Sequence, residues 1–287
     1  MAQLCRMPVM IHRCYLEVTN VCNLNCVFCP KTSRKPQYIT EEDFNFIVDR
    51  LAGRVRFLYL HLMGEPLLHP LLPVFVATAR AKGLQPIVTT NGTLLDKNMP
   101  LAESGAYKVQ ISLHSHEGNG KDDPQSYIAG VAEFAKRAAC AGSIVVMRLW
   151  NKGGLDAQNE MLLSLLEGHF AKPWTKRSDG MRLAEKIYIE YGDKFDWPDS
   201  SIKENVSTDV FCHALRNQIG VLVDGSVVPC CLDHDGDMTI GNIFRQTLDE
   251  ILSAPRARAI YDGFTEHKAV EDLCRRCGYA NQKLFHQ

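Results

Sequence analysis

Residues 14–29 read CYLEVTNVCNLNCVFC, and this stretch decides how the rest of the chain is interpreted. Over its first six residues apolar and polar side chains alternate, a period of two that is typical of a β-strand. Three cysteines, Cys22, Cys26 and Cys29, follow directly, on the segment that leaves the carboxyl end of that strand. The sequence therefore predicts a strand that delivers three thiols to one edge of a sheet.

The strand pattern recurs downstream, separated by longer segments with helical spacing of apolar residues. Candidate helices cover residues 40–53, 71–82, 94–103, 126–141 and 156–166, and Thr40 is the predicted N-cap of the first. Crossovers of this length suit parallel strands, although an antiparallel sheet with one solvated face would also alternate. The candidate strands are Cys14 to Thr19, Phe57 to Met63, Pro86 to Thr90, Val109 to Leu113, Ile144 to Leu149 and Ile187 to Tyr191.

The polar faces of these strands predict an open interior. If helices cover the apolar face, the polar side chains must point into a lumen. A closed eight-stranded barrel fills its interior with branched apolar side chains, so we expect an α/β fold with a partial (β/α)6 TIM-like barrel whose lumen holds substrate. Each polar residue could instead be a hydrogen-bonded interior residue without a catalytic part. The predicted lumen residues are Tyr15, Glu17, Tyr59, His61, Gln110, Arg148, Trp150, Tyr188 and Glu190.

Size and charge limit the possible partners. The chain has 287 residues, 46% of them hydrophobic, which is enough for a large core. Its 32 basic and 33 acidic residues nearly cancel, so no global field favours nucleic acid or an anionic membrane. The first residues lack the pattern of a secretory signal, and no apolar run approaches the ~20 residues needed to span a bilayer. We expect a cytoplasmic protein that holds a small molecule in a pocket.

The eleven cysteines are grouped, which in a reducing compartment favours metal binding over disulfides. Thiolates bind soft metals, and three of them leave one iron of a four-iron cubane without a protein ligand. Structural zinc normally takes four protein ligands, so a zinc site here would need a distant fourth ligand or an open position. The first group, Cys22, Cys26 and Cys29, therefore predicts an iron-sulfur cluster with one open iron.

At these residues the chain resembles the radical S-adenosylmethionine (SAM) superfamily, whose signature CxxxCxxC has an aromatic residue before the third cysteine, here Phe28. The resemblance implies that the methionine part of SAM chelates the open iron of a 4Fe-4S cluster. One electron then splits SAM into methionine and a 5'-deoxyadenosyl radical, which abstracts hydrogen from substrate. It also implies an electron donor of the flavodoxin or ferredoxin type. The protein itself positions the substrate and the cofactor and excludes water from the site.

Further motifs support this resemblance, each following its own strand. Met63-Gly64-Glu65-Pro66 is similar to the Gly-Gly-Glu motif with which the family binds the methionine amino group, with Met63 in place of the first glycine. By the same resemblance, Asn91, Ser112 and His114 contact the cofactor, although Asn91-Gly92 could be a plain turn and Ser112 a satisfied core hydroxyl. The residues implied to bind SAM are Phe28, Gly64, Glu65, Pro66, Asn91, Ser112 and His114.

A second group of cysteines lies near the carboxyl end. Cys212, Gly225 and Cys230 form C-x12-G-x4-C, with a hairpin predicted around Asp224-Gly225. This resembles the SPASM domains of the superfamily and their shorter twitch form, which implies an auxiliary 4Fe-4S cluster. A zinc ribbon is the alternative. The implied ligands are Cys212, Cys230, Cys274 and Cys277, with Cys231 a spare or a substitute, and the predicted domains are residues 1–205 (barrel) and 206–287 (twitch/SPASM-like).

The resemblance implies a radical SAM enzyme, an oxidoreductase or a lyase, acting on a small molecule in preference to a peptide. Sequences at the strand ends, such as HLMGEP, ISLHS and MRLW, resemble the queuine lyase branch of queuosine salvage. The alternatives within the superfamily are a peptide-modifying or a dehydrogenase enzyme of the SPASM/twitch group. From other classes, we consider a zinc-stabilised binding protein and an iron-sulfur electron carrier.

Overall fold

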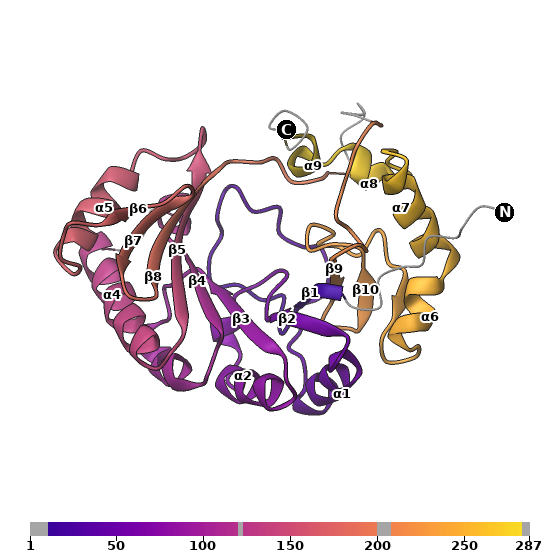
Figure 1. Cartoon of the computed structure of the whole chain (residues 1–287), viewed down its shortest axis with the longest axis horizontal. Coiled ribbons are helices and arrows are strands. Elements are labelled where there is room, and N and C mark those ends of the chain that lie inside the picture. The colour runs from indigo at the N-terminus through magenta and orange to yellow at the C-terminus, as the bar shows by residue number, and fades with distance from the viewer. Residues whose placement is uncertain (1–10, 120–122, 200–207, 283–287) are drawn as a thin grey trace.

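A single eleven-stranded sheet curls around a central lumen, with helices along its outer face (Figure 1). The computed structural model describes residues 11–119, 123–199 and 208–282. The strand order is β11-β10-β9-β1-β2-β3-β4-β5-β8-β7-β6. No helix among the described residues is both long and apolar enough to span a bilayer.

Six adjacent strands of this sheet are parallel and form the predicted partial barrel. They pair in the order β1-β2-β3-β4-β5-β8, so the parallel alternative is confirmed and the antiparallel one is wrong. Their bounds are β1 (Ile11–Leu16), β2 (Val55–Tyr59), β3 (Gln85–Thr90), β4 (Lys108–Ser112), β5 (Ile144–Lys152) and β8 (Ile187–Asp193). Between β5 and β8 the chain adds an antiparallel edge, β6 (Thr175–Lys176) and β7 (Gly180–Ala184).

Amphipathic helices cover the outer face of the barrel. Thr40 caps the first of them as predicted, since its side chain accepts a hydrogen bond from Asp43 N. Phe44 of that helix stacks on Phe75 of the next, with ring centroids 4.0 Å apart, and both rings are fully buried. The helices are α1 (Glu41–Leu51), α2 (Leu72–Ala81), α4 (Pro124–Cys140) and α5 (Asn159–Glu167).

Two predicted segments differ from the structure. Residues 94–103 do not form an α-helix: Asp96–Glu103 is a 3-10 segment (η2), kinked at Asn98, because Pro100 cannot continue an α-helical hydrogen-bond ladder. The first strand, predicted over Cys14 to Thr19, ends earlier, at Leu16 of β1, and Ser115–Asn119 form the short helix α3 after β4. A further 3-10 turn, η1 (Pro66–Leu68), follows β2.

The carboxyl-terminal part continues the same sheet. β9 (Gln218–Val221) pairs in parallel with β1 and forms the predicted hairpin with β10 (Ser226–Val228), where Gly225 has a φ of 81°. β11 (Gly241–Asn242) completes this edge, and α6 (Leu248–Ser253), α7 (Pro255–Thr265), α8 (Asp272–Arg275) and α9 (Gly278–Gln282) follow. The boundary near residue 205 stays a prediction, since one sheet runs across both predicted domains.

Glu17 lies at the junction of these parts. Its carboxylate is fully buried and binds Arg34 through two hydrogen bonds of 2.6 and 2.7 Å. It also accepts hydrogen bonds from Met63 N, after β2, and from Val223 N, in the hairpin. A buried carboxylate is stable only when it is paired and hydrogen-bonded. Glu17 therefore connects the loop that carries Arg34, the segment after β2 and the carboxyl-terminal hairpin.

We expect Glu17→Gln to lower the free energy of unfolding by about 3 kcal/mol, because Arg34, whose side chain is only 16% exposed, then loses the carboxylate that binds it through two hydrogen bonds. Glu103→Gln is the control: Glu103 pairs with Arg137 on the surface, where both side chains are at least half exposed, and should cost below about 1 kcal/mol. Urea unfolding of both variants measures the difference. Equal unfolding midpoints would show that the Glu17 ion pair does not hold the fold.

Candidate functional site

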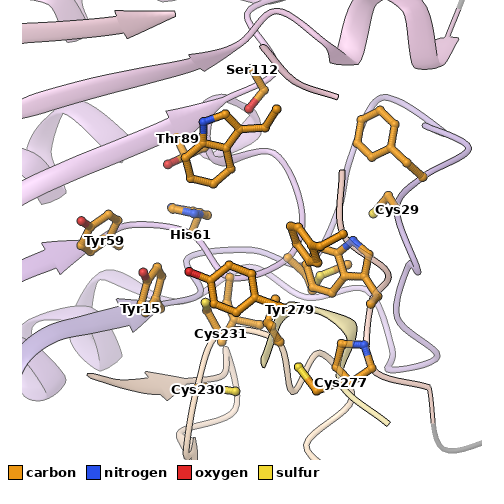
Figure 2. Close-up of a pocket in the computed structure, with 18 of the residues that line it drawn as sticks. Tyr15, Cys29, Tyr59, His61, Thr89, Ser112, Cys230, Cys231, Cys277 and Tyr279 are labelled. Carbon is orange, nitrogen blue, oxygen red and sulfur yellow. The ribbon is translucent and has the colours of Figure 1, made fainter. Parts of the chain in front are cut away.

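A cavity of about 1090 Å³ occupies the lumen and opens at the carboxyl ends of the parallel strands. Residues of both cysteine groups line it, together with side chains from five of the six barrel strands (Figure 2). Parallel strands end at the same edge of a sheet, which explains why residues far apart in sequence meet here.

The first cysteine group sits on the loop that follows β1. Cys22 is exposed, Cys29 is partly buried and Cys26 is buried. Burial raises the pKa of the Cys22 thiol, the hydrogen bond from Leu24 N lowers it, and the neighbouring Glu65, Cys26 and Cys29 raise it further. Leu24 N and Asn119 Nδ2 donate hydrogen bonds to the sulfurs of Cys22 and Cys26, at 3.4 and 2.9 Å.

The donor atoms of this group bear on its chemistry. Among the described residues, no set of three or more His, Cys, Asp or Glu side chains is arranged to hold a single metal ion. The donors are all thiols, as an iron-sulfur cluster requires.

Gly64 and Glu65 form a cradle beside the first cysteine group. Gly64 has a φ of 76°, and a Cβ there would collide with the carbonyl oxygens of Thr19 and Val21. Glu65 is 2% exposed, and its carboxylate accepts hydrogen bonds from Leu67 N and Asn91 N but pairs with no described cation. Burial raises its pKa to about 7, so a bound ammonium group would fit this carboxylate well.

The other residues implied to bind SAM divide into two sets. Phe28, Asn91, Ser112 and His114 line the cavity, and the rings of Phe28 and His114 lie 5.4 Å apart. His114 Nδ1 bonds the carbonyl oxygen of Arg148, which orients the imidazole. Pro66 does not line the cavity: it is buried as the first residue of η1 and shapes the turn that Glu65 caps.

The second cysteine group faces the first across the cavity mouth. Cys212, Cys230, Cys274 and Cys277 all line the cavity, and Figure 2 shows Cys230 and Cys277 near each other. Burial raises the pKa of the Cys230 thiol, and the surrounding four cysteines raise it further. The fifth, Cys231, hydrogen-bonds with Tyr15, so its side chain lies at the lumen (Figure 2).

Six of the nine predicted lumen residues line the cavity, and we call this set the inner pocket: Tyr15, Tyr59, His61, Gln110, Arg148 and Trp150. Tyr15 and Tyr59 stack with ring centroids 4.6 Å apart, and the Arg148 guanidinium lies 4.4 Å from the Trp150 ring. Figure 2 shows His61 between the two tyrosines and the side that carries Thr89 and Ser112.

The other three predicted lumen residues do not line the cavity. Glu17 points to Arg34, because its position past the end of β1 brings it under the loop after the first cysteine group. Tyr188 lies 5.1 Å beneath the Arg177 guanidinium. Glu190 Oε1 accepts a hydrogen bond of 2.9 Å from the indole Nε1 of Trp150. Glu190 therefore orients a side chain of the inner pocket without lining the cavity itself.

Sequence reasoning missed several residues at the site. Asn119 reaches Cys26 from α3, and Lys31 donates from its Nζ to Cys26 O at 2.9 Å. Trp197, like Cys29 and Cys231, packs against a small apolar cluster beside the cavity, and Phe195 contacts both Trp197 and Tyr279. The string Phe195-Asp-Trp197 after β8 carried an aromatic signal at a strand's carboxyl end that could have identified this set.

A partial barrel with thiol groups at its mouth and a polar lumen defines a class of metal-cluster enzyme, and comparisons with known proteins agree. The profile of the radical SAM superfamily matches residues 16–153, and that of an iron-sulfur cluster-binding domain, SPASM, matches residues 212–278. The chain belongs to the radical SAM superfamily and carries a SPASM-type domain. Its cofactors are SAM, the 4Fe-4S cluster that binds it, and an auxiliary iron-sulfur cluster.

Individual relatives narrow the comparison. The chain is 26% identical to an S-adenosyl-L-methionine-dependent 2-deoxy-scyllo-inosamine dehydrogenase of Niallia circulans, over 91% of this chain and 90% of that one. A crystal structure of BtrN in complex with AdoMet and 2-DOIA superposes with a TM-score of 0.60 and 19% identity, over 93% of each chain. Streptococcus suis SuiB bound to S-adenosylmethionine gives 0.61 and 15%, over 97% of this chain and 73% of SuiB.

These findings confirm the predicted fold class, enzyme class and cofactors. They do not support the queuine lyase resemblance, and they support the dehydrogenase alternative better. The zinc-stabilised binding protein and the electron carrier are likewise not supported, since the relatives and profiles are those of SAM enzymes. The individual cluster ligands stay predictions.

We expect Gly64→Ala to weaken SAM binding at least tenfold and to lower the free energy of unfolding by more than the ~1–2 kcal/mol of a left-handed alanine, because the added Cβ displaces the loop after β1. Gly53→Ala is a matched control, with a φ of 73° and open space around its Cβ. Equilibrium dialysis with SAM and thermal unfolding compare the two. Similar losses in both variants would exclude a close-packing role for Gly64.

Two cysteine variants test the proposed ligand sets. Cys22→Ala should lower the iron content of reconstituted protein from about eight to about four atoms per chain and abolish SAM cleavage. Cys230→Ala should lower iron equally but spare reductive SAM cleavage in the absence of substrate. Iron analysis and 5'-deoxyadenosine formation measure both effects. Cys140→Ala is the control, and unchanged iron in Cys22→Ala would refute the first ligand set.

Proposed function

We propose that this protein oxidises an alcohol group of a polar small molecule to a carbonyl group by radical chemistry. The observation that carries the proposal is the relationship, over nine-tenths of both chains, to a SAM-dependent dehydrogenase of a small cyclic substrate. The inner pocket, whose lining includes the hydrogen-bonding groups of His61, Gln110 and Arg148, supports a polar substrate.

The cofactors supply the radical: when bound, they provide the 5'-deoxyadenosyl radical that takes a hydrogen atom from substrate and an acceptor for the electron that the substrate then releases. We propose that Cys22, Cys26 and Cys29 hold the first cluster, and that Cys212, Cys230, Cys274 and Cys277 hold the second. Gly64, Glu65 and Asn91 bind the methionine part of SAM through the cradle described above.

The protein's other contribution is to position the substrate and exclude water. The inner pocket and both cysteine groups line one cavity, so a substrate held there shares that cavity with the radical source and the electron acceptor. Trp197 and Tyr279 line the cavity, and we propose that these aromatic side chains shield a radical from solvent. The electron donor of flavodoxin or ferredoxin type and a cytoplasmic location stay predictions.

A deuterium experiment tests this function. Polyols and cyclitols deuterated at the carbinol carbon are incubated anaerobically with reconstituted protein, SAM and dithionite. We expect deuterium in 5'-deoxyadenosine and one carbonyl product per deoxyadenosine formed for the true substrate. Deoxyadenosine formation stimulated by a peptide and by no alcohol would overturn the proposal in favour of a peptide-modifying enzyme.

A further inference from the structure

The charges that line the cavity are unbalanced. Among its described lining residues are four cationic side chains, Arg13, Lys31, Arg148 and Lys194, and one carboxylate, Glu65. The seven cysteines proposed as cluster ligands also line the cavity and carry negative charge as thiolates, so a net positive charge is confined to the inner pocket, which contains none of them. A net positive wall there attracts an anion and repels a cation. The imbalance is meaningful only if those cations are not already neutralised by neighbouring groups.

Two of the cations are accounted for locally. Lys31 donates to the Cys26 carbonyl oxygen beside the first cysteine group, where thiolates provide negative charge. Lys194 pairs with Asp196 at 3.3 Å on the surface. Glu65 is used by two main-chain N–H groups and lies in the SAM cradle. The charges of the inner pocket are therefore set by Arg148, with Arg13 at its edge.

Arg148 is 9% exposed and forms no ion pair with any described carboxylate, although Glu190, which accepts a hydrogen bond from the Trp150 indole, is near enough to favour its charged form. Its Nη2 donates to Ser112 Oγ at 3.1 Å, its guanidinium rests on Trp150, and its Nε is buried without a partner. Burial lowers its pKa to about 10, so it stays charged at neutral pH. A buried guanidinium without a counter-ion is destabilising unless a ligand supplies the negative charge.

The neighbours of Arg148 present donors to the same space. Gln110 Oε1 accepts from Thr89 Oγ1, which leaves the Gln110 amide NH₂ for a ligand. His61 is neutral, because burial and the adjacent Arg148 lower its pKa to about 3. Its Nδ1 is buried and unpartnered, so Nε2, which makes no hydrogen bond with the described residues, is the nitrogen open to the cavity. Neither group can neutralise a cationic ligand.

We propose that the inner pocket selects a substrate carrying an anionic group, a carboxylate or a phosphate ester, and that Arg148 binds this group through its planar fork with support from Gln110 and His61. The inference rests on the proposed function and names its substrate class. A guanidinium binds either oxyanion through two parallel hydrogen bonds. The relative's substrate is by name an amine, so this pocket differs in the charge that it recognises.

Binding is measured without turnover, on protein reconstituted with both clusters and SAM but without reductant. The probes share a six-membered polyol ring: myo-inositol is neutral, 2-deoxy-scyllo-inosamine is cationic, myo-inositol 1-phosphate carries a phosphate and D-glucuronate a carboxylate. Anaerobic calorimetry should show at least tenfold tighter binding of one of the two anions than of either other probe. Which anion binds distinguishes the two sources of negative charge.

Variants assign the preference to Arg148. Arg148→Gln should weaken binding of the preferred anion at least tenfold and weaken SAM binding much less. Arg148→Lys, which keeps the charge but loses the planar fork, should give an intermediate loss of anion binding. Lys152→Gln is the control on the same strand, since Lys152 is exposed and belongs to no cavity wall. An unfolding midpoint within a few degrees of the parent confirms that Arg148→Gln folds, and Arg148→Lys carries the test if it does not.

Three outcomes would overturn the inference: tightest binding of the amine, equal binding of all four probes, or an anion preference that survives in Arg148→Gln. Loss of SAM affinity in Arg148→Gln with unchanged probe binding would likewise assign Arg148 to the cofactor. None of these outcomes depends on radical chemistry. A negative result in the deuterium experiment would therefore refute the proposed oxidation without affecting the measured preference for an anion.

Discussion

The buried carboxylate of Glu17 is the constraint on which the arrangement of the site depends. It stands just past the end of β1 and binds Arg34, the main chain after β2 and the main chain of the carboxyl-terminal hairpin. A second carboxylate, Asp235, accepts hydrogen bonds from Thr32 and Ser33 on the same loop. The loop that follows the first three cysteines is therefore held from the barrel and from the SPASM-type region at once.

This constraint explains why the two cysteine groups open on one cavity. β9 pairs in parallel with β1, so both strands end at the same edge of the sheet. The first group follows β1 directly, whereas Cys230 follows the hairpin that β9 begins. Since the sheet is continuous across the predicted domain boundary, the distance between the groups is set by strand pairing, which is stiffer than a contact between independent domains.

Much of the fold could be predicted because alternation and cysteine spacing are local signals. The parallel barrel strands, the Thr40 cap and the hairpin at Gly225 all followed from residues close in sequence. What could not be predicted depends on partners brought in by the fold. Alternation places Glu17 on the polar face but says nothing of Arg34, and it cannot show that Glu190 is taken up by Trp150. Asn119 was missed because α3 is too short to have a periodic pattern.

The same distinction applies to charge. Overall composition is neutral, and it gives no sign of a polarised interior. The imbalance arises because the acidic residues near the lumen are already engaged: Glu17 with Arg34, Glu190 with the Trp150 indole, and Glu65 with main-chain N–H groups. Arg148 forms no ion pair with a described carboxylate, although it too is buried, with 9% of its surface exposed. A folded chain tolerates an unpaired buried charge where a bound ligand supplies the opposite charge. The cavity wall at Arg148 therefore favours an anionic ligand.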